Sequence, residues 1–110
     1  MLGKRNRLTK RGSFNYVYTK GAAKAVGAIK LTYVSAKGQP KIGISVPNSV
    51  GKAVVRNKVR RRIRAAMRGY VAHIKPSQIV ISARKGAESL TYAQIDGKLY
   101  ELLNKSGLYA

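Results

Sequence analysis

The sequence predicts an α+β sandwich, in which helices pack against one face of a small mixed β-sheet. Two segments, 29–34 and 42–46, place apolar residues at every second position, the period that is typical of strands. A third strand is predicted at 79–84. Two further segments, 53–68 and 91–103, repeat apolar residues with the helical period of about 3.6. The chain has 110 residues, the length of one ordinary domain, so we expect a single domain over 1–110.

The N-terminal third is expected to contain a short helix ahead of the first of these strands. Residues 1–12 are rich in Lys and Arg, and we expect them to be extended or loosely ordered. Ser13 can cap a short helix over 14–18, which Gly21 then ends. A further short strand fits near 24–26.

The rest of the chain alternates strands and helices. Residues 37–40 indicate a turn into the second strand. Gly69 is placed to stop the helix at 53–68. Thr91 and Gln94 fit a capping box that opens the last helix. The predicted order is therefore α-β-β-(β)-α-β-α, where the parentheses mark that the run of two strands becomes three if the short strand near 24–26 is counted.

The charge of the chain indicates a polyanionic partner. Lys and Arg number 23 against three acidic residues, which gives a formal net charge of +20. Self-repulsion on this scale destabilises the compact state, and solubility alone does not require it. RNA or DNA accounts for the charge best, and an anionic membrane surface accounts for it less well.

Other features of the sequence indicate the cellular compartment. The chain has no cysteine, which suits a reducing environment and excludes a disulfide framework. It has no apolar run of about 18 residues, the length that a membrane-spanning helix needs. Its first residues lack the apolar core of a secretory signal. We therefore expect a cytoplasmic protein.

The helix at 53–68 gives the strongest functional signal. Its apolar arc, which must face the sheet, consists of Val55, Val59, Ile63, Ala66 and Met67. A continuous i,i+4 ridge of arginines beside this arc consists of Arg56, Arg60, Arg64 and Arg68. Like charges at this spacing cost about 0.2–0.5 kcal/mol each, and no acid precedes Glu88 to offset them. Guanidinium forks match phosphate oxygens, so the ridge predicts a nucleic-acid face rather than a bare solvent face.

The same segment resembles a known family signature. Residues 50–64, VGKAVVRNKVRRRIR, are similar to the signature of the bacterial ribonuclease P protein. That pattern has an Ala three residues before an Arg-Asn pair, then basic-aliphatic-basic-Arg, then an Arg three residues further on. All of these positions are filled here. Segments 5–21, 41–46, 79–84 and 106–109 also resemble the family, so the likeness covers nearly the whole chain in the expected order.

The resemblance implies a function and a fold. The protein would be the non-catalytic subunit of ribonuclease P, the endoribonuclease that removes the 5′ leader of precursor tRNA. Its partners would be the catalytic RNA and precursor tRNA, with no membrane and no DNA. The RNA subunit would cleave with Mg²⁺, and no cofactor is expected on the protein itself. The fold would resemble that of ribosomal protein S5 domain 2, with a left-handed β-α-β crossover around the signature helix, against the usual hand.

The resemblance also implies site residues. Contacts to the catalytic RNA fall on Arg56, Asn57, Lys58, Arg60, Arg61, Arg64 and Arg68. A cleft for the single-stranded leader falls on Phe14, Tyr18, Tyr33, Gly43 and Ser45. Accessory basic residues are Arg5, Arg7 and Lys52. Aromatic rings can stack on unpaired bases, although Tyr33 shares a strand face with Ile29 and Leu31, which favours its burial.

This chain departs from the family pattern at two places. Residues 47–49, Pro-Asn-Ser, stand where many members have basic residues, which puts phosphate contacts from that loop in doubt. Lys58 stands where the family has an Arg, which keeps the charge and loses the fork.

We predict no catalytic or metal-binding residue on the polypeptide. Hydrolysis by protein alone usually needs clustered carboxylates or paired histidines, and this chain has three acids and one His. The main alternative is a structural RNA-binding protein of ribosomal or assembly type. An independent nuclease is disfavoured by the few acids, helix-turn-helix DNA binding by the flanking strands, and a membrane-active helix by arginines that nearly encircle it.

Overall fold

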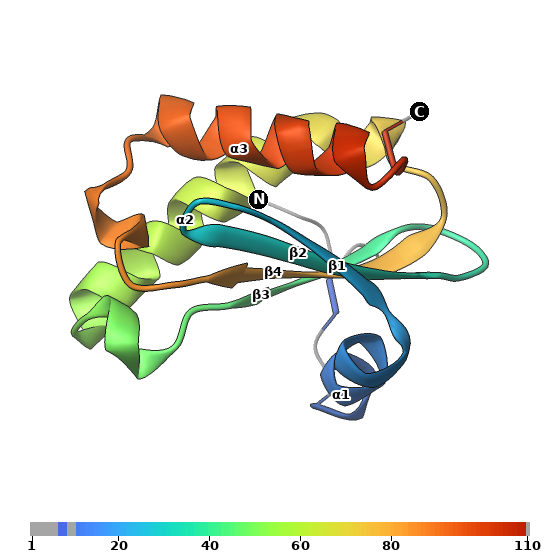
Figure 1. The fold of residues 1–110 in the computed structure, drawn as a ribbon, viewed down its shortest axis with the longest axis horizontal. Helices are drawn as coiled ribbons and strands as arrows, with labels where there is room; N and C mark the ends of the chain where they lie inside the picture. The colour runs from blue at the N-terminus through green and yellow to red at the C-terminus, as the bar shows by residue number, and fades with distance from the viewer. Residues whose placement is uncertain (1–6, 9–10, 110) are drawn as a thin grey trace.

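The computed structural model describes residues 7–8 and 11–109 (Figure 1). The helices are α1 (Arg11–Lys20), α2 (Ala53–Tyr70) and α3 (Tyr92–Lys105), and the strands are β1 (Ala22–Val26), β2 (Ile29–Ser35), β3 (Lys41–Ser45) and β4 (Ser77–Ala83). Short 3-10 helices are η2 (Asn48–Val50), η3 (Val71–His73) and η4 (Ala87–Ser89). The predicted order of elements is confirmed, and it includes the further short strand, β1.

The four strands form one mixed sheet in the order β1-β2-β4-β3. β2 pairs antiparallel with both β1 and β4, whereas β3 pairs parallel with β4. α2 therefore crosses over between two parallel neighbours, β3 and β4. The left hand of this crossover stays a prediction.

The two edges of the sheet differ. A short extended segment covers the β3 edge, where the Leu8 N–H donates to the Ile42 carbonyl oxygen at 2.9 Å and Arg7 bridges to Ile42. The outer side of β1 pairs with no other strand of the described residues. Its residues 22–25 are exposed. The sheet thus has one covered edge and one open edge.

Helices cover both faces of the sheet (Figure 1). α2 and α3 pack on one face, which we call the helix-pair face, where the core gathers strand residues including Ile29, Leu31, Ile79 and Ile81. α1 lies on the opposite face, the α1 face, where Val17 packs with Leu8 and Val80 in a second, smaller cluster. The prediction that all helices share one face is wrong for α1. Because consecutive residues 79–81 of β4 are all buried, this central strand needs cover on both sides.

Two predicted helix ends also differ from the structure. Ser13 lies inside α1 rather than capping it, since the helix begins at Arg11. Gly69 does not end α2, which runs to Tyr70 because Tyr70 and Val71 pack against the core and extend the apolar stripe. The capping box at α3 is confirmed, with Thr91 Oγ1 accepting from the Gln94 N–H at 3.2 Å.

An aromatic cluster fastens the C-terminal residues to the end of α2. The rings of Tyr70, Tyr100 and Tyr109 lie 5.5–6.1 Å apart, and His73 stacks on Tyr109 at 5.9 Å. The Tyr70 hydroxyl donates to Asp96 Oδ1 at 2.9 Å. Burial, aided by this hydrogen bond to Asp96, raises the pKa of Tyr70 to about 12. This cluster belongs to the helix-pair side of the molecule.

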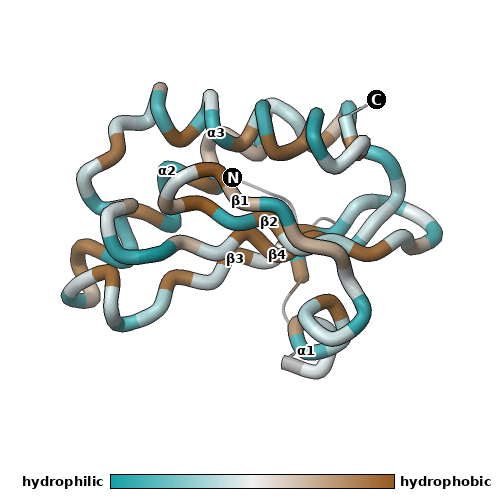
Figure 2. Tube along the Cα trace, in the orientation of Figure 1, coloured by the Kyte–Doolittle hydropathy of each residue, from teal (hydrophilic) through white to brown (hydrophobic). Residues whose placement is uncertain are grey.

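Figure 2 shows hydrophobic residues recurring along α3 and along the strands beneath it. Such amphipathic elements bury one side and leave the other to solvent. Within residues 7–8 and 11–109, no helix combines the length and the hydropathy needed to cross a membrane.

Candidate nucleic-acid interface

α2 buries its apolar arc and presents its charged residues away from the core. Val59, Ile63, Ala66 and Met67 are at most 1% exposed, as the helical wheel predicts. Asn57, Lys58, Arg61 and Arg68 are exposed, and Arg56, Arg60 and Arg64 are half-buried. The polar side of this helix is therefore at most partly covered by the rest of the described chain.

Local hydrogen bonds orient two arginines of the ridge. Arg56 Nε donates to the Gly51 carbonyl oxygen at 3.1 Å, and Arg60 Nη1 donates to Asn57 Oδ1 at 2.8 Å. A guanidinium has five N–H groups, so each bond leaves most of them for another acceptor. These side chains are held in place and can still bind phosphate oxygens.

Every carboxylate side chain of the protein is engaged elsewhere. Both oxygens of Glu88 accept from the Gly86 N–H at 2.7 and 2.9 Å. Asp96 accepts from Tyr70, and Glu101 pairs with Lys105 at 2.9 Å. All three acids belong to η4 and α3, and none forms an ion pair with an arginine of α2. No arginine of α2 is therefore neutralised by an ion pair with an acid side chain of the described residues.

Arg62 differs from the other arginines of α2. Its Nη1 donates to the Leu90 carbonyl oxygen at 2.6 Å and so ties α2 to the segment that precedes α3. Arg62→Ala should lower the free energy of unfolding by about 1–2 kcal/mol, because this carbonyl loses its partner. The dependence of RNA affinity on salt should barely change. Thermal melts and binding titrations over a range of salt concentrations test both expectations.

Arg61→Ala is the matched control for this variant, because Arg61 is exposed on the same helix. It should leave the melting temperature unchanged and flatten the salt dependence of RNA binding. Equal effects of the two variants on both measurements would contradict the separate roles.

A hollow of about 130 Å³ joins α1, β3 and α2. It is lined by Arg7, Leu8, Phe14, Ile42, Gly43, Ile44 and Arg64. A Cβ atom on Gly43 would lie 2.4 Å from the Phe14 ring, so only glycine lets the ring lie over β3 at this point. The structure thus brings the predicted pair Phe14 and Gly43 together, and Arg64 of the ridge borders the same hollow.

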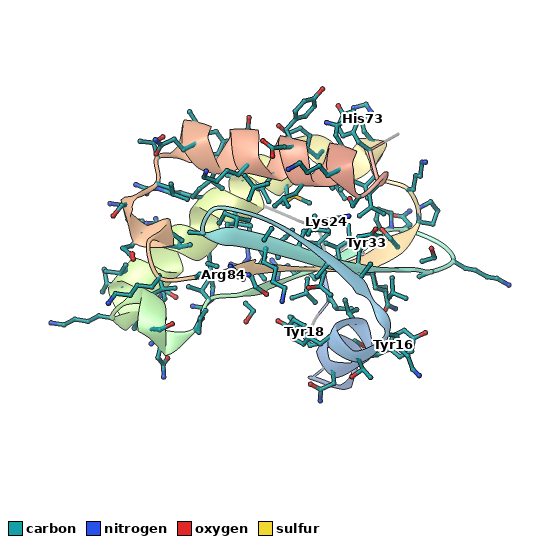
Figure 3. All side chains as sticks on the ribbon, in the orientation of Figure 1. Tyr16, Tyr18, Lys24, Tyr33, His73 and Arg84 are labelled. Carbon is teal, nitrogen blue, oxygen red and sulfur yellow. The ribbon has the colours of Figure 1, made fainter. Side chains whose placement is uncertain are left out.

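Tyr18 extends this surface along the α1 face. Its hydroxyl lies 3.3 Å from Ser82 Oγ, and 44% of the residue is exposed. Ser45 is paired in register with Ser82, so it lies on the same face. In Figure 3 the Tyr18 side chain points from α1 along the underside of the sheet. Sequence reasoning missed Ser82, although its alternation with Ile81 and Ala83 in β4 places it here.

Tyr33 does not join this surface. It pairs in register with Ile79 and packs against the core of the helix-pair face, opposite Phe14 and Tyr18. The period of two explains the correction, because Tyr33 must share the face of Ile29 and Leu31. Figure 3 shows Tyr33 on the other side of the sheet from Tyr18.

The accessory basic residues have separate positions. Arg7 lies at the covered β3 edge and borders the hollow. Lys52 is exposed at the N-cap of α2 and makes no side-chain cap there. Arg5 falls outside the described residues. Those residues also bring no three His, Cys, Asp or Glu side chains together as a metal site would require.

The chain is similar to proteins of one kind. A family model described as Ribonuclease P matches residues 2–107. The ribonuclease P protein component of Bacillus velezensis is 36% identical over 108 residues, which cover 96% of this chain and 93% of the relative. A solved structure of the Staphylococcus aureus RNase P protein superposes with a TM-score of 0.89 at 29% identity, covering 96% of this chain and 98% of that one. The RNase P protein of Thermotoga maritima gives 0.81 at 26% identity, covering 90% and 96%.

Proposed function

Because this chain belongs to the bacterial ribonuclease P protein family, whose role is maturation of tRNA 5′ ends, we propose that its arginine ridge binds the catalytic RNA and its α1 face binds the leader of precursor tRNA. The ridge consists of Arg56, Arg60, Arg64 and Arg68, with Asn57, Lys58 and Arg61 beside it. The leader surface consists of Phe14, Tyr18, Gly43 and Ser45. Tyr33 is left out, because it lies on the opposite face.

The hollow at β3 is the observation that supports this proposal most. Arg64 belongs to the ridge, and Phe14 belongs to the aromatic surface, yet both line the same small space over Gly43. One continuous surface can therefore contact the catalytic RNA on one side and an unpaired strand on the other. A protein in this position would hold the leader beside the RNA that cleaves it.

We assign the hydrolysis itself to the RNA subunit and its Mg²⁺. In support, each of the three acids already has a partner, Gly86, Tyr70 or Lys105, and His73 stacks on Tyr109 in the C-terminal cluster. The polypeptide would neutralise phosphates where the catalytic RNA meets its substrate. Leader contacts would add affinity for precursor tRNA over mature tRNA. The absence of cysteine suits a protein that binds RNA in the reducing cytoplasm.

The proposal is tested by Tyr18→Ala in the enzyme reconstituted with its cognate catalytic RNA. Affinity for precursor tRNA should fall about tenfold, within the 1–3 kcal/mol that one stacked base contributes. Affinity for mature tRNA should not change, because it has no leader. Equilibrium titration of both RNAs against wild type and variant measures the difference.

Tyr16→Ala is the control, because Tyr16 is 51% exposed on the same helix and points away from Tyr18 in Figure 3. It should behave as wild type. A Tyr18→Ala enzyme that binds both RNAs as wild type does would contradict the leader surface. Equal loss for precursor and mature tRNA would instead favour the structural RNA-binding alternative.

A further inference from the structure

We infer that Lys30, Ser82 and Ser45 form a polar row across the α1 face that binds a phosphate group of the single-stranded leader beside Tyr18. This inference rests on the proposed function and adds to it the site of a backbone contact. Neither Lys30 nor Ser82 belongs to the signature or to its aromatic flanks.

The register of the sheet places Lys30, Ser82 and Ser45 next to one another. Lys30 of β2 pairs with Ser82 of β4, and Ser82 pairs with Ser45 of β3. Neighbouring strands lie about 4.8 Å apart, so the three side chains stand side by side on one face. Their chain neighbours Ile29, Ile81 and Ile44 point to the core of the helix-pair face. The row therefore faces the same side as α1.

The row is accessible and lies next to the aromatic surface. Lys30, Ser82 and Ser45 are each half-buried, so α1 does not close over them. The Tyr18 hydroxyl lies 3.3 Å from Ser82 Oγ, which brings the ring to the middle of the row. Gly43 precedes Ser45 by two residues on β3, about 6.6 Å along the strand. A strand of RNA that passes Phe14 over Gly43 would meet the row next.

The chemistry of the row suits a phosphate group. A lysine ammonium offers three donors and a positive charge, and each serine hydroxyl offers one more donor. Within residues 7–8 and 11–109, the Lys30 ammonium has no ion pair or side-chain hydrogen bond. The three carboxylates are held by Gly86, Tyr70 and Lys105. A phosphodiester group of the leader, which carries one negative charge, would supply the charge that the protein does not.

The position of Lys30 in the sheet indicates that this lysine does more than protect an edge strand from pairing. β2 lies between β1 and β4, so Lys30 sits in an inner strand, where lysine is disfavoured and partly desolvated. Lysines commonly protect edge strands from pairing with another chain. That role explains Lys24 on the open strand β1 and does not explain Lys30. Lys24 pairs in register with Leu31, on the helix-pair face.

The two lysines make a matched test, because each replacement removes one charge from the same part of the sheet on opposite faces. In the reconstituted enzyme, Lys30→Ala should weaken binding of precursor tRNA about 3- to 10-fold, the scale of one charge-assisted contact. The slope of log affinity against log salt should become shallower by about 0.7, the value for one phosphate of a single strand. Binding of mature tRNA should not change, and Lys24→Ala should change neither quantity.

Two further variants exclude a folding defect. Lys30→Gln keeps most of the side-chain stem and should lose the contact, whereas Lys30→Arg should keep the affinity and the salt slope. Thermal melts of each variant should match wild type. If Lys30→Ala and Lys30→Gln bind precursor tRNA as Lys24→Ala does, the polar row is not a phosphate site.

The test separates this inference from the proposed function. Tyr18→Ala measured alongside reports whether the α1 face contacts the leader at all. A leader-dependent loss in Tyr18→Ala with none in Lys30→Ala overturns only the polar row. No leader-dependent loss in either variant overturns the proposed leader surface as well.

Discussion

Replacing Arg60 and Arg64 together with alanine should weaken binding of the catalytic RNA by roughly 100-fold, because two guanidinium–phosphate contacts of about 1–1.5 kcal/mol each are lost. Both residues are half-buried on the outer side of α2, and Arg64 borders the hollow over Gly43. The slope of log affinity against log salt should become shallower by about 1.8 if both arginines contact helical RNA. Filter binding or fluorescence titration over a range of monovalent salt measures both quantities.

Lys37→Ala combined with Lys75→Ala removes the same charge from exposed positions outside α2. This control separates a specific contact from a general loss of positive charge. It should weaken RNA binding far less than the arginine pair. A salt slope that stays at the wild-type value in the Arg60 and Arg64 double variant would show that these side chains do not contact phosphates.

Adding the protein to its cognate catalytic RNA should let precursor tRNA be cleaved correctly at roughly tenfold lower Mg²⁺, because protein cations replace Mg²⁺ in neutralising neighbouring phosphates. The net charge of +20 and the lack of an ion pair between any acid side chain and an arginine of α2 are the reasons for expecting a large effect. Cleavage rate measured against Mg²⁺ concentration, with and without protein, gives the shift directly.

The double variant provides the control for this second experiment. Its reconstituted enzyme should need more Mg²⁺ than the wild-type enzyme when enough variant protein is added to saturate the RNA. An Mg²⁺ requirement that the wild-type protein leaves unchanged would count against charge neutralisation as its contribution.

The sequence predicts α2 well, because its buried apolar residues and its arginines lie on the same helix and follow the same period. The apolar arc at Val59, Ile63 and Met67 fixes which side packs on the sheet, and the arginines then follow from the helical period. The capping box at Thr91 is equally local, since its two hydrogen bonds join residues three apart. Predictions of this kind need no knowledge of tertiary structure.

The position of α1 could not be predicted in the same way. Its apolar residues Phe14 and Val17 fit either face of the sheet, and only the two-sided burial of β4 decides between them. Gly69 failed as a helix stop because the packing of Tyr70 outweighs the conformational freedom of one glycine. Both errors concern contacts between segments that lie far apart in the sequence.

The leader surface could be predicted from the sequence only in part. The alternation in β2 was visible in the sequence, and it assigns Tyr33 to the core and Lys30 to the opposite face. What the sequence lacked was the identity of the face that α1 occupies. Once α1 is placed over Gly43, the alternation in β2 and in β4 puts Lys30 and Ser82 on the same face of the sheet as Tyr18.

The unequal edges of the sheet limit how this protein can self-associate. Growth of a fibril by strand addition needs two unpaired sheet edges on every molecule, because each added molecule must present an unpaired edge strand to the next one. Here the Arg7–Leu8 segment pairs with β3 at one edge, and among the described residues β1 is the edge strand left unpaired on its outer side. Strand pairing through β1 could therefore join two molecules and would stop there, so aggregation of the folded protein in the absence of RNA would have to proceed by another route.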